Sequence, residues 1–389
     1  METRIFSPIS IGNIRRGLII AVGVAIPFSN ALTNVLMLAI ILWFFLAGHC
    51  QNQFHKLFRY PIVPAALLLF AALGIGLFYT SAPLVEALSI LKKYRELLYI
   101  PLFIILFNDE TARRLGLNTF MLATVVILCL SYGSIYFGSG YDSNPAIFKN
   151  YITQGILVAL VAYFLTIQVI AEKKWRILKL IVILLAIYHI TFISPGRTGF
   201  LVLFGLIWLF LYQRYRWRGL FFGGLGLILL SVLVLSVSDS LRTRMTDIVT
   251  YLENPQQLKS DSSTVLRYGF MKNTIELIAQ RPLFGYGTGS FAHEYQKLVQ
   301  QRGVYPTTNP HSEFLMLTVQ LGMVGLLLFC YLFYQLWKTG DLLPLYQRQM
   351  IQGLVVAMSI GCLFNSLLLD ASEAHLFAYL TGLFLADSY

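Results

Sequence analysis

Hydrophobic residues in this chain come in long runs that short polar stretches separate. About 20 consecutive apolar residues are enough to cross a lipid bilayer as a helix. Twelve candidate runs lie at about 17–29, 31–48, 62–79, 95–107, 115–137, 151–171, 177–193, 198–212, 219–237, 311–336, 349–369 and 373–388. The pattern predicts an all-α polytopic membrane protein with about twelve transmembrane helices.

The composition supports this class. Only 12% of the 389 residues are charged and 57% are hydrophobic, whereas a soluble domain has about 25% charged residues. The mean hydropathy is +0.70. The net charge of +11 comes from Lys and Arg in short loops rather than from a basic stripe interleaved with aromatic residues. We therefore expect membrane lipids, and not nucleic acid, as the surroundings of this protein.

The basic residues also predict the orientation. An even number of spans returns both termini to one side of the membrane. Most of the Lys and Arg in short loops, such as Arg15, Arg16, Lys173 and Lys174, fall on the side of the termini, and this excess marks the cytoplasmic side. The predicted organisation is nine transmembrane helices in 1–237, an outside loop in 238–310 and three more transmembrane helices in 311–389.

The outside loop is long and polar, and loops of this length usually have a function. Residues 264–279 place Leu266, Phe270 and Leu277, with Ile275 and Ile278, on one broad apolar stripe. This predicts an amphipathic helix that lies against the membrane surface or the transmembrane bundle, starts near Asp261 and ends at Arg281-Pro282.

Cofactor sites are not predicted. Gly285, Gly287 and Gly289 follow the loop helix, but no strand precedes them and their spacing does not fit a nucleotide-binding loop. A turn packed under the loop helix is the better interpretation. The cysteines, which are Cys50, Cys129, Cys330 and Cys362, do not occur at metal-binding spacing, so we expect neither a disulfide nor a metal site.

Two arginines stand at predicted outside positions. Arg197 lies in the turn Ser194–Gly199 between two spans, where Pro and Gly break the helix and Thr198 is placed to cap the next one. Arg267 lies one turn into the loop helix. Guanidinium groups at such places grip phosphate bidentately. The alternatives are that Arg197 extends to lipid headgroups and that Arg267 is a solvated helix charge.

A histidine and a carboxylate stand on the same side. His311 follows Asn309-Pro310, which predicts Asn309 as an N-cap and His311 in the first helical turn, where the helix dipole keeps the imidazole neutral and able to accept a proton. Asp370 ends an apolar run and is placed to orient His311 or to hold a sugar hydroxyl. The alternatives are an interfacial histidine and a solvated helix-end charge.

Lys92, Lys93 and Arg95 depart from the orientation rule, because they are basic residues on the predicted outside face. They are expected either to widen a basic entrance for phosphates or to bind anionic headgroups. The interiors of the predicted spans, in contrast, contain almost no charge, which argues against a transporter driven by protons or sodium ions.

Three local motifs carry a family resemblance: the Ser-Pro-Gly-Arg197-Thr-Gly turn, Arg267 with the downstream stretch Arg281–Gly287, and Asn309–Leu315 with the sequence Asn-Pro-His-Ser-Glu-Phe-Leu. With them, the chain resembles the O-antigen ligase family, the membrane glycosyltransferases related to O-antigen polymerases. The overall plan is similar as well, with about twelve spans and a long periplasmic loop before the last three.

The resemblance implies a GT-C-like enzyme of the bacterial inner membrane that needs no cofactor and no metal. Such an enzyme transfers a glycan from undecaprenyl diphosphate to a sugar hydroxyl of lipid A-core at the periplasmic face, with inversion. Carried over to this chain, Arg197 and Arg267 hold the diphosphate, His311 is the base, and Asp370 assists. An O-antigen polymerase, a protein O-oligosaccharyltransferase and a non-catalytic lipid or glycan transporter remain alternatives.

Overall fold

The computed structural model describes residues 8–46, 57–137, 146–194, 196–237, 246, 263–300, 302 and 305–386. All regular elements in these residues are helices. They are α1 (Pro8–Phe28), α2 (Asn30–Leu46), α4 (Ile62–Gly76), α5 (Leu84–Lys93), the 3₁₀-helix η1 (Arg95–Leu98), α6 (Tyr99–Leu106), α7 (Glu110–Phe137), α8 (Tyr151–Ala171), α9 (Arg176–Tyr188), the π-helix η2 (His189–Ile193), α10 (Arg197–Val237), α12 (Ser263–Gln280), α13 (Phe291–Gln300), α14 (Glu313–Asp341), α15 (Leu345–Phe364) and α16 (Ala371–Leu385).

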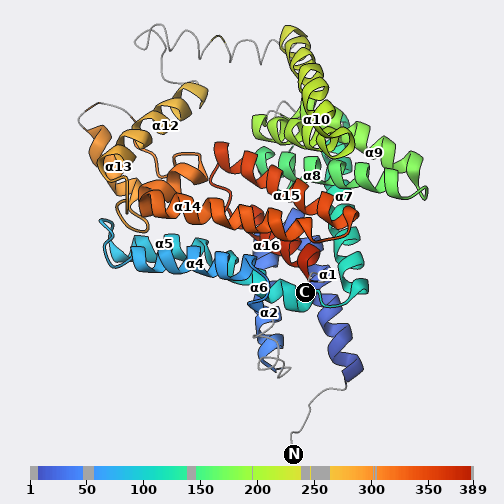
Figure 1. The fold of residues 1–389 in the computed structure, drawn as a ribbon, viewed down its shortest axis with the longest axis horizontal. Helices are drawn as coiled ribbons and strands as arrows, with labels where there is room; N and C mark the ends of the chain where they lie inside the picture. The colour runs from blue at the N-terminus through green and yellow to red at the C-terminus, as the bar shows by residue number, and fades with distance from the viewer. Residues whose placement is uncertain are drawn as a thin grey trace, which may run out of the picture.

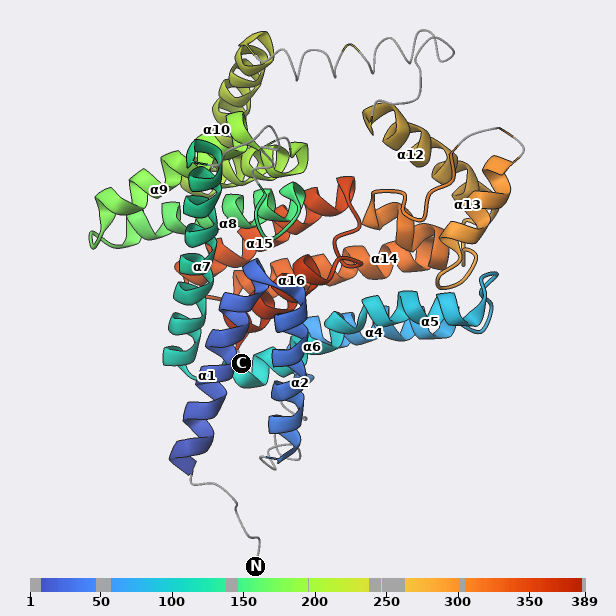
Figure 2. The ribbon, with the colours of Figure 1, turned by 180° about the vertical axis from the view of Figure 1, so that it is seen from behind.

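The helix α16 lies at the centre of the bundle, and every residue from Ser372 to Leu385 is buried. It packs against α6, α15 and α1, while α14 packs between α4 and α15, and α8 packs between α9 and α10. The pair α12 and α13 lies at one end of the molecule, beside α14, and α9 lies at the opposite end (Figures 1 and 2). The core is apolar because nearly every helix is hydrophobic on more than one face.

The helices agree with the predicted runs in position. Five of those described are long and apolar enough to cross a membrane, namely α7, α8, α9 with η2, the stretch Arg197–Gly226 of α10, and α14. The others are shorter or less apolar, so the prediction of about twelve transmembrane helices is not confirmed. The runs 198–212 and 219–237 form one element, α10, which a break at Arg216 divides. The chain is an all-helical protein with several candidate membrane spans.

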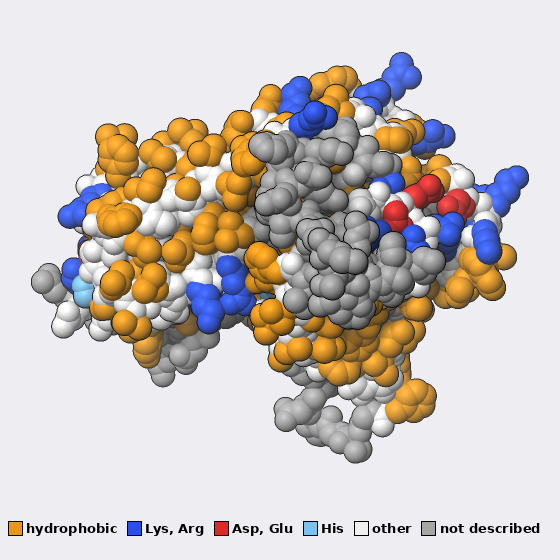
Figure 3. Space-filling view, turned by 90° about the horizontal axis from the view of Figure 1, so that it is seen from below, with side chains coloured by type: hydrophobic (Ala, Val, Ile, Leu, Met, Phe, Trp, Pro, Cys, Tyr) orange, Lys and Arg blue, Asp and Glu red, His pale blue; other side chains and the backbone are white. Residues whose placement is uncertain are grey.

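Large hydrophobic side chains remain exposed on the outer helices. Phe45 of α2 is 69% exposed, Leu122 of α7 64%, Ile177 of α9 77% and Phe221 of α10 70%. Figure 3 shows hydrophobic side chains over much of one face, with Lys and Arg gathered toward its edges. Exposed apolar surface on this scale is unfavourable in water, and its presence indicates a multi-pass membrane protein.

The glycine-rich turn is attached to a break in α14. Gly322 has φ 65° and ψ −155°, so the helix is interrupted there. The carbonyl groups of Val319 and Gln320 are thereby released from the helix, and they accept hydrogen bonds from the N–H groups of Tyr286 (2.9 Å) and Gly287 (2.8 Å). Beyond the break, the Met323 N–H donates to the carbonyl of Pro282 at 2.8 Å. The turn therefore satisfies backbone groups that a broken helix would leave unpaired.

The same turn is fixed on its other side to α4. The Thr288 N–H donates to the Gly76 carbonyl at 3.1 Å, and the Thr288 hydroxyl donates to the Leu73 carbonyl. Gly287 has φ +91°, and a Cβ atom there would overlap Thr80. The predicted turn is present. It packs between α4 and α14, where the absence of a side chain at Gly287 allows the close approach, and also against the loop helix, because Tyr286 joins the cluster of Leu277 and its hydroxyl donates to the Gln280 side chain at 3.0 Å.

The loop helix is present as α12 and ends before Arg281, as expected. Its predicted start at Asp261 lies outside the described residues. Leu277 is buried against α13 and α14, with Phe270 and Ile278 packed at the edge of the same cluster, whereas Ile275 is 57% exposed. The helix therefore packs on the bundle, and α13, which was not predicted, completes this cluster through Phe291, Tyr295 and Val299.

We expect Gly322→Ala to destabilise the protein. The backbone at Gly322 is in a region that only glycine adopts readily, which costs about 1–3 kcal/mol for another residue, and a Cβ atom would overlap the backbone of Leu283. The midpoint of thermal unfolding in detergent should fall clearly. Gly74→Ala is the matched control, because a Cβ atom on Gly74 of α4 meets no atom within 4 Å. Equal midpoints for the two variants would contradict this role of the break.

Candidate functional site

His311 lies between the loop and α14 and not on a helix. Its backbone is left-handed, with φ 56°, and its N–H donates to the side-chain oxygen of Asn309 at 2.8 Å. The N-cap of α14 is Ser312, whose hydroxyl accepts the N–H of Leu315. The prediction that Asn309 is the N-cap and His311 belongs to the first turn is therefore wrong, because the Asn309 side chain closes a turn two residues ahead of the helix.

The surroundings of His311 keep its imidazole neutral. The ring is half-buried and nearly parallel to the ring of Phe270, with 6.1 Å between centroids and 22° between planes. Burial, and then the positive charge of Arg267, lower the pKa of His311 to about 4. The prediction of a neutral histidine agrees with this, but the causes are desolvation and a neighbouring cation instead of a helix dipole.

Arg267 and His311 are thus brought together by α12. Phe270 is three residues after Arg267 on the same helix, so both side chains point to one face of α12. Phe270 also packs against Tyr295 of α13, which fixes the helix on its neighbour. The amphipathic loop helix therefore has a definite position over His311.

Arg197 lies at the start of α10, which is bonded through Asn365 to the residues that follow His311. It is the first residue of that helix, and the adjacent Thr198 is buried. We predicted that Thr198 caps this helix, but its hydroxyl has a different partner. It accepts a hydrogen bond from the side-chain amide of Asn365 at 2.8 Å. The Asn365 carbonyl in turn accepts the N–H of Glu313, two residues after His311, at 3.2 Å.

The segment between α15 and α16 connects these parts. The hydroxyl of Ser366 donates to the side-chain oxygen of Asn309 at 2.8 Å. The fully buried Glu313 accepts the Leu368 N–H at 2.9 Å and the Tyr94 hydroxyl at 2.6 Å. Glu313 therefore has a structural role that sequence reasoning did not assign to it. These bonds hold the His311 turn, the start of α10 and the segment that leads to Asp370 as one unit.

Asp370 precedes α16 and is exposed at its side chain. Desolvation by the surrounding protein raises the pKa of its carboxyl group, and the positive charge of Lys93 opposes this effect. Lys93 ends α5, so the basic cluster does reach Asp370. Lys92 is exposed. Arg95 is occupied inside the protein, because it donates to the Asn34 side chain at 2.6 Å and lies 3.5 Å from Glu96.

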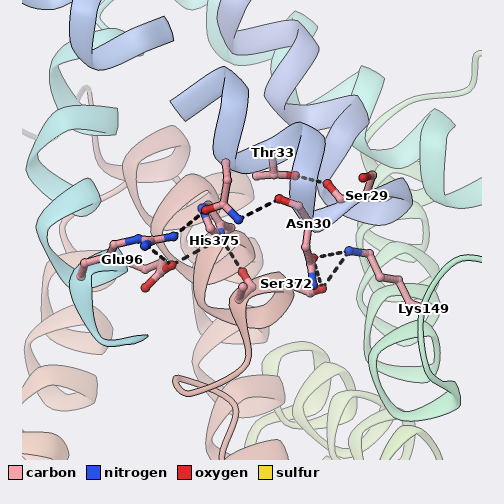
Figure 4. Close-up of polar contacts among 10 residues, drawn as sticks. Ser29, Asn30, Thr33, Glu96, Lys149, Ser372 and His375 are labelled. Carbon is pink, nitrogen blue, oxygen red and sulfur yellow. Dashed lines mark hydrogen bonds and ion pairs between the residues drawn. The ribbon is translucent and has the colours of Figure 1, made fainter. Parts of the chain in front are cut away.

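A second polar network joins Asn30, Lys149 and Ser372 at the start of α16 (Figure 4). The Lys149 ammonium donates to Ser372 at 2.9 Å and to the side-chain oxygen of Asn30, and the Ser372 hydroxyl donates to the same Asn30 oxygen at 2.6 Å. Sequence reasoning did not select these three residues. The one sequence signal that could have brought them together is that all three residues lie in turns predicted on the outside face of the membrane.

Comparison with known proteins assigns a family to part of the chain. Residues 189–330 match the family model described as O-Antigen ligase, which confirms the resemblance over that region. This segment includes Arg197, Arg267 and His311 and ends before Asp370. An uncharacterized protein of Haemophilus influenzae (strain ATCC 51907 / DSM 11121 / KW20 / Rd) is 25% identical over 249 residues, 59% of this chain and 61% of that protein. The chain thus spans about 61% of the length of that relative.

We expect Arg267→Gln to raise the pKa of His311. The guanidinium disfavours the imidazolium form, so its removal makes protonation easier and moves the pKa upward from about 4. Histidine-selective NMR titration of the protein in detergent measures this, with the signal assigned by its loss in His311→Ala. Arg302→Gln is the control, because Arg302 pairs with Glu276 at the exposed surface. An unchanged pKa in Arg267→Gln would contradict the contact.

Proposed function

We propose that this protein is an O-antigen ligase. It transfers a glycan from undecaprenyl diphosphate to a sugar hydroxyl of lipid A-core at the periplasmic face of the bacterial inner membrane, by a metal-independent inverting mechanism. The observation that carries the proposal is the packing of Phe270, three residues after Arg267 on α12, against His311 within the segment that matches O-Antigen ligase. A proton acceptor next to a fixed cation suits attack by a hydroxyl on a substrate with an anionic leaving group.

In this reaction the acceptor oxygen forms a bond to the anomeric carbon, while the bond from that carbon to the diphosphate oxygen breaks. The bonding electrons leave with the diphosphate, whose growing negative charge Arg197 and Arg267 stabilise more in the transition state than in the ground state. The hydroxyl proton passes to the His311 imidazole. The leaving group needs no proton, because the arginines balance its charge.

The electrostatics of the site couple the base to the donor. A histidine with a pKa of about 4 is a weak base, and a pKa nearer the working pH is more effective. A diphosphate bound at Arg267 brings negative charge close to His311 and so raises its pKa. His311 therefore becomes an effective base when the donor is bound.

Asp370 and Lys93 have supporting roles in this proposal. Lys93 adds positive charge at the entrance, and Asp370 accepts hydrogen bonds from a sugar.

The direct test uses purified protein in detergent with EDTA and a polyprenyl diphosphate-linked glycan. A product that needs lipid A-core supports the ligase. Lengthened carrier-linked glycan without lipid A-core would identify a polymerase, and transfer to protein would identify an oligosaccharyltransferase. In lipid vesicles that contain the purified protein, movement of the carrier lipid between leaflets without any product would identify a transporter.

We expect His311→Ala to lower kcat by about 10²–10⁴-fold, the usual contribution of a general base, with the affinity for the donor unchanged. Single-turnover transfer and equilibrium binding of the carrier-linked glycan measure the two quantities. His293→Ala is the control, since His293 is a partly buried histidine of α13 outside the proposed site. Loss of donor binding in His311→Ala would refute its assignment as the base.

We expect Arg267→Lys to lower kcat/KM by about 10–100-fold, because an ammonium cannot reproduce the two-point grip of a guanidinium on phosphate. Arg302→Lys makes the same exchange at the surface pair with Glu276 and should retain activity. Steady-state kinetics with the carrier-linked donor distinguish the two variants. Full activity of Arg267→Lys would favour the alternative in which Arg267 is a solvated charge.

A further inference from the structure

A pocket of about 320 Å³ opens beside Asp370, on the side of α16 where Lys149 lies. Its walls come from the junction of α1 and α2, the segment 148–150 before α8, the first turn of α8 and residues 370–373. All of these segments are predicted on the same face of the membrane as His311. The pocket shares Asp370 with the candidate site, but it does not include Arg197, Arg267 or His311.

The polar side chains of the pocket include both hydrogen-bond donors and hydrogen-bond acceptors. Lys149 is a donor, Asn30 offers its side-chain NH2 group, Ser372 offers a hydroxyl oxygen, and Asp370 is an acceptor. Lys149, Asn30 and Ser372 hold one another by hydrogen bonds, so their positions are fixed before any ligand arrives. Burial lowers the pKa of Lys149 to about 8, and the carboxyl group of Glu373 opposes that effect. The pocket is thus polar without a strong excess of positive charge.

A buried carboxyl group in the wall lacks one partner. Glu373 lines the pocket and is 2% exposed. One of its oxygens accepts the Thr153 hydroxyl, whereas Oε2 has no hydrogen-bond partner among the described residues. A buried polar atom without a partner is costly, and a ligand hydroxyl that donates to this carboxyl group would remove the cost.

Two aromatic side chains also contribute to the wall, which is otherwise mostly polar. The rings of Phe28 and Phe148 meet edge to face with 5.0 Å between centroids, and both line the pocket. An aromatic surface beside fixed donors and acceptors matches a sugar ring, which has apolar C–H faces and a rim of hydroxyl groups. A phosphate would be less well matched, because the carboxyl group of Asp370 shares the pocket with Lys149.

We propose that this pocket is a subsite for an uncharged, hydroxyl-rich sugar unit of one of the two glycan substrates. The inference rests on the proposed function, in that the carrier-linked glycan and the core acceptor are the available sources of such a unit. A sugar seated against Asp370 is held next to the segment 365–370, which is bonded to the His311 turn. The subsite therefore positions a glycan for transfer and takes no part in the chemical step.

The test separates binding from transfer. Two soluble probes are prepared: the oligosaccharide released by mild acid from the carrier-linked glycan of the source cells, and the core oligosaccharide released from their lipid A. Saturation-transfer NMR with purified protein should show binding of one probe. Asn30→Ala should weaken that binding about 5–50-fold, the effect of losing hydrogen bonds to a sugar. Asn118→Ala, at an exposed asparagine of α7, should leave it unchanged.

Kinetics identify the source of the sugar. In Asn30→Ala, KM should rise for the substrate that supplies the bound probe, while kcat and the KM of the other substrate stay near their original values. Ser372→Ala provides a second variant if Asn30→Ala folds poorly. Equal binding of both probes to wild type and both variants would overturn the subsite. Probe binding that depends on Asn30 in a protein with no transfer activity would retain the subsite and refute the proposed function instead.

Discussion

The arrangement of this protein depends on one contact, in which the backbone of a turn forms hydrogen bonds with the backbone of a broken helix. The turn 285–289 lies at the break that Gly322 makes in α14, where the Tyr286 and Gly287 N–H groups donate to the carbonyls of Val319 and Gln320. Just before the turn, the Pro282 carbonyl accepts the Met323 N–H. The turn also reaches the carbonyl of Gly76 in α4. Because α12 directly precedes this turn and α13 directly follows it, the position of both helices relative to the bundle is determined by these few bonds.

A second set of hydrogen bonds holds together the segments that form the candidate site. Asn365 and Ser366 lie between two helices, where their side chains are free to bond other segments, and they connect Thr198 with Asn309. Glu313 adds a buried connection to Tyr94. The residues proposed for chemistry are therefore attached to a continuous polar framework near helix ends, where backbone groups need partners in any case.

The sequence was sufficient for the helical class and for the positions of the apolar helices, since these follow from hydrophobic periodicity alone. It also selected His311 and Arg267, which the structure places near each other. It was wrong about the start of α14, because Asn309 and Ser312 are equally good caps in isolation, and in the structure the Asn309 side chain bonds the His311 N–H and the Ser366 hydroxyl instead. It did not select Asn30, Lys149 or Ser372, because their proximity depends on how three distant turns pack.

The stacking of Phe270 on His311 restricts the direction from which the imidazole is used. Phe270 lies nearly parallel to the ring, with 6.1 Å between centroids, while an imidazole accepts a proton through a lone pair in the plane of the ring. Proton transfer therefore requires a partner that approaches the edge of the ring. A molecule that lies flat against the exposed face contacts His311 without reacting, so the geometry of approach selects among hydroxyl groups that are chemically alike.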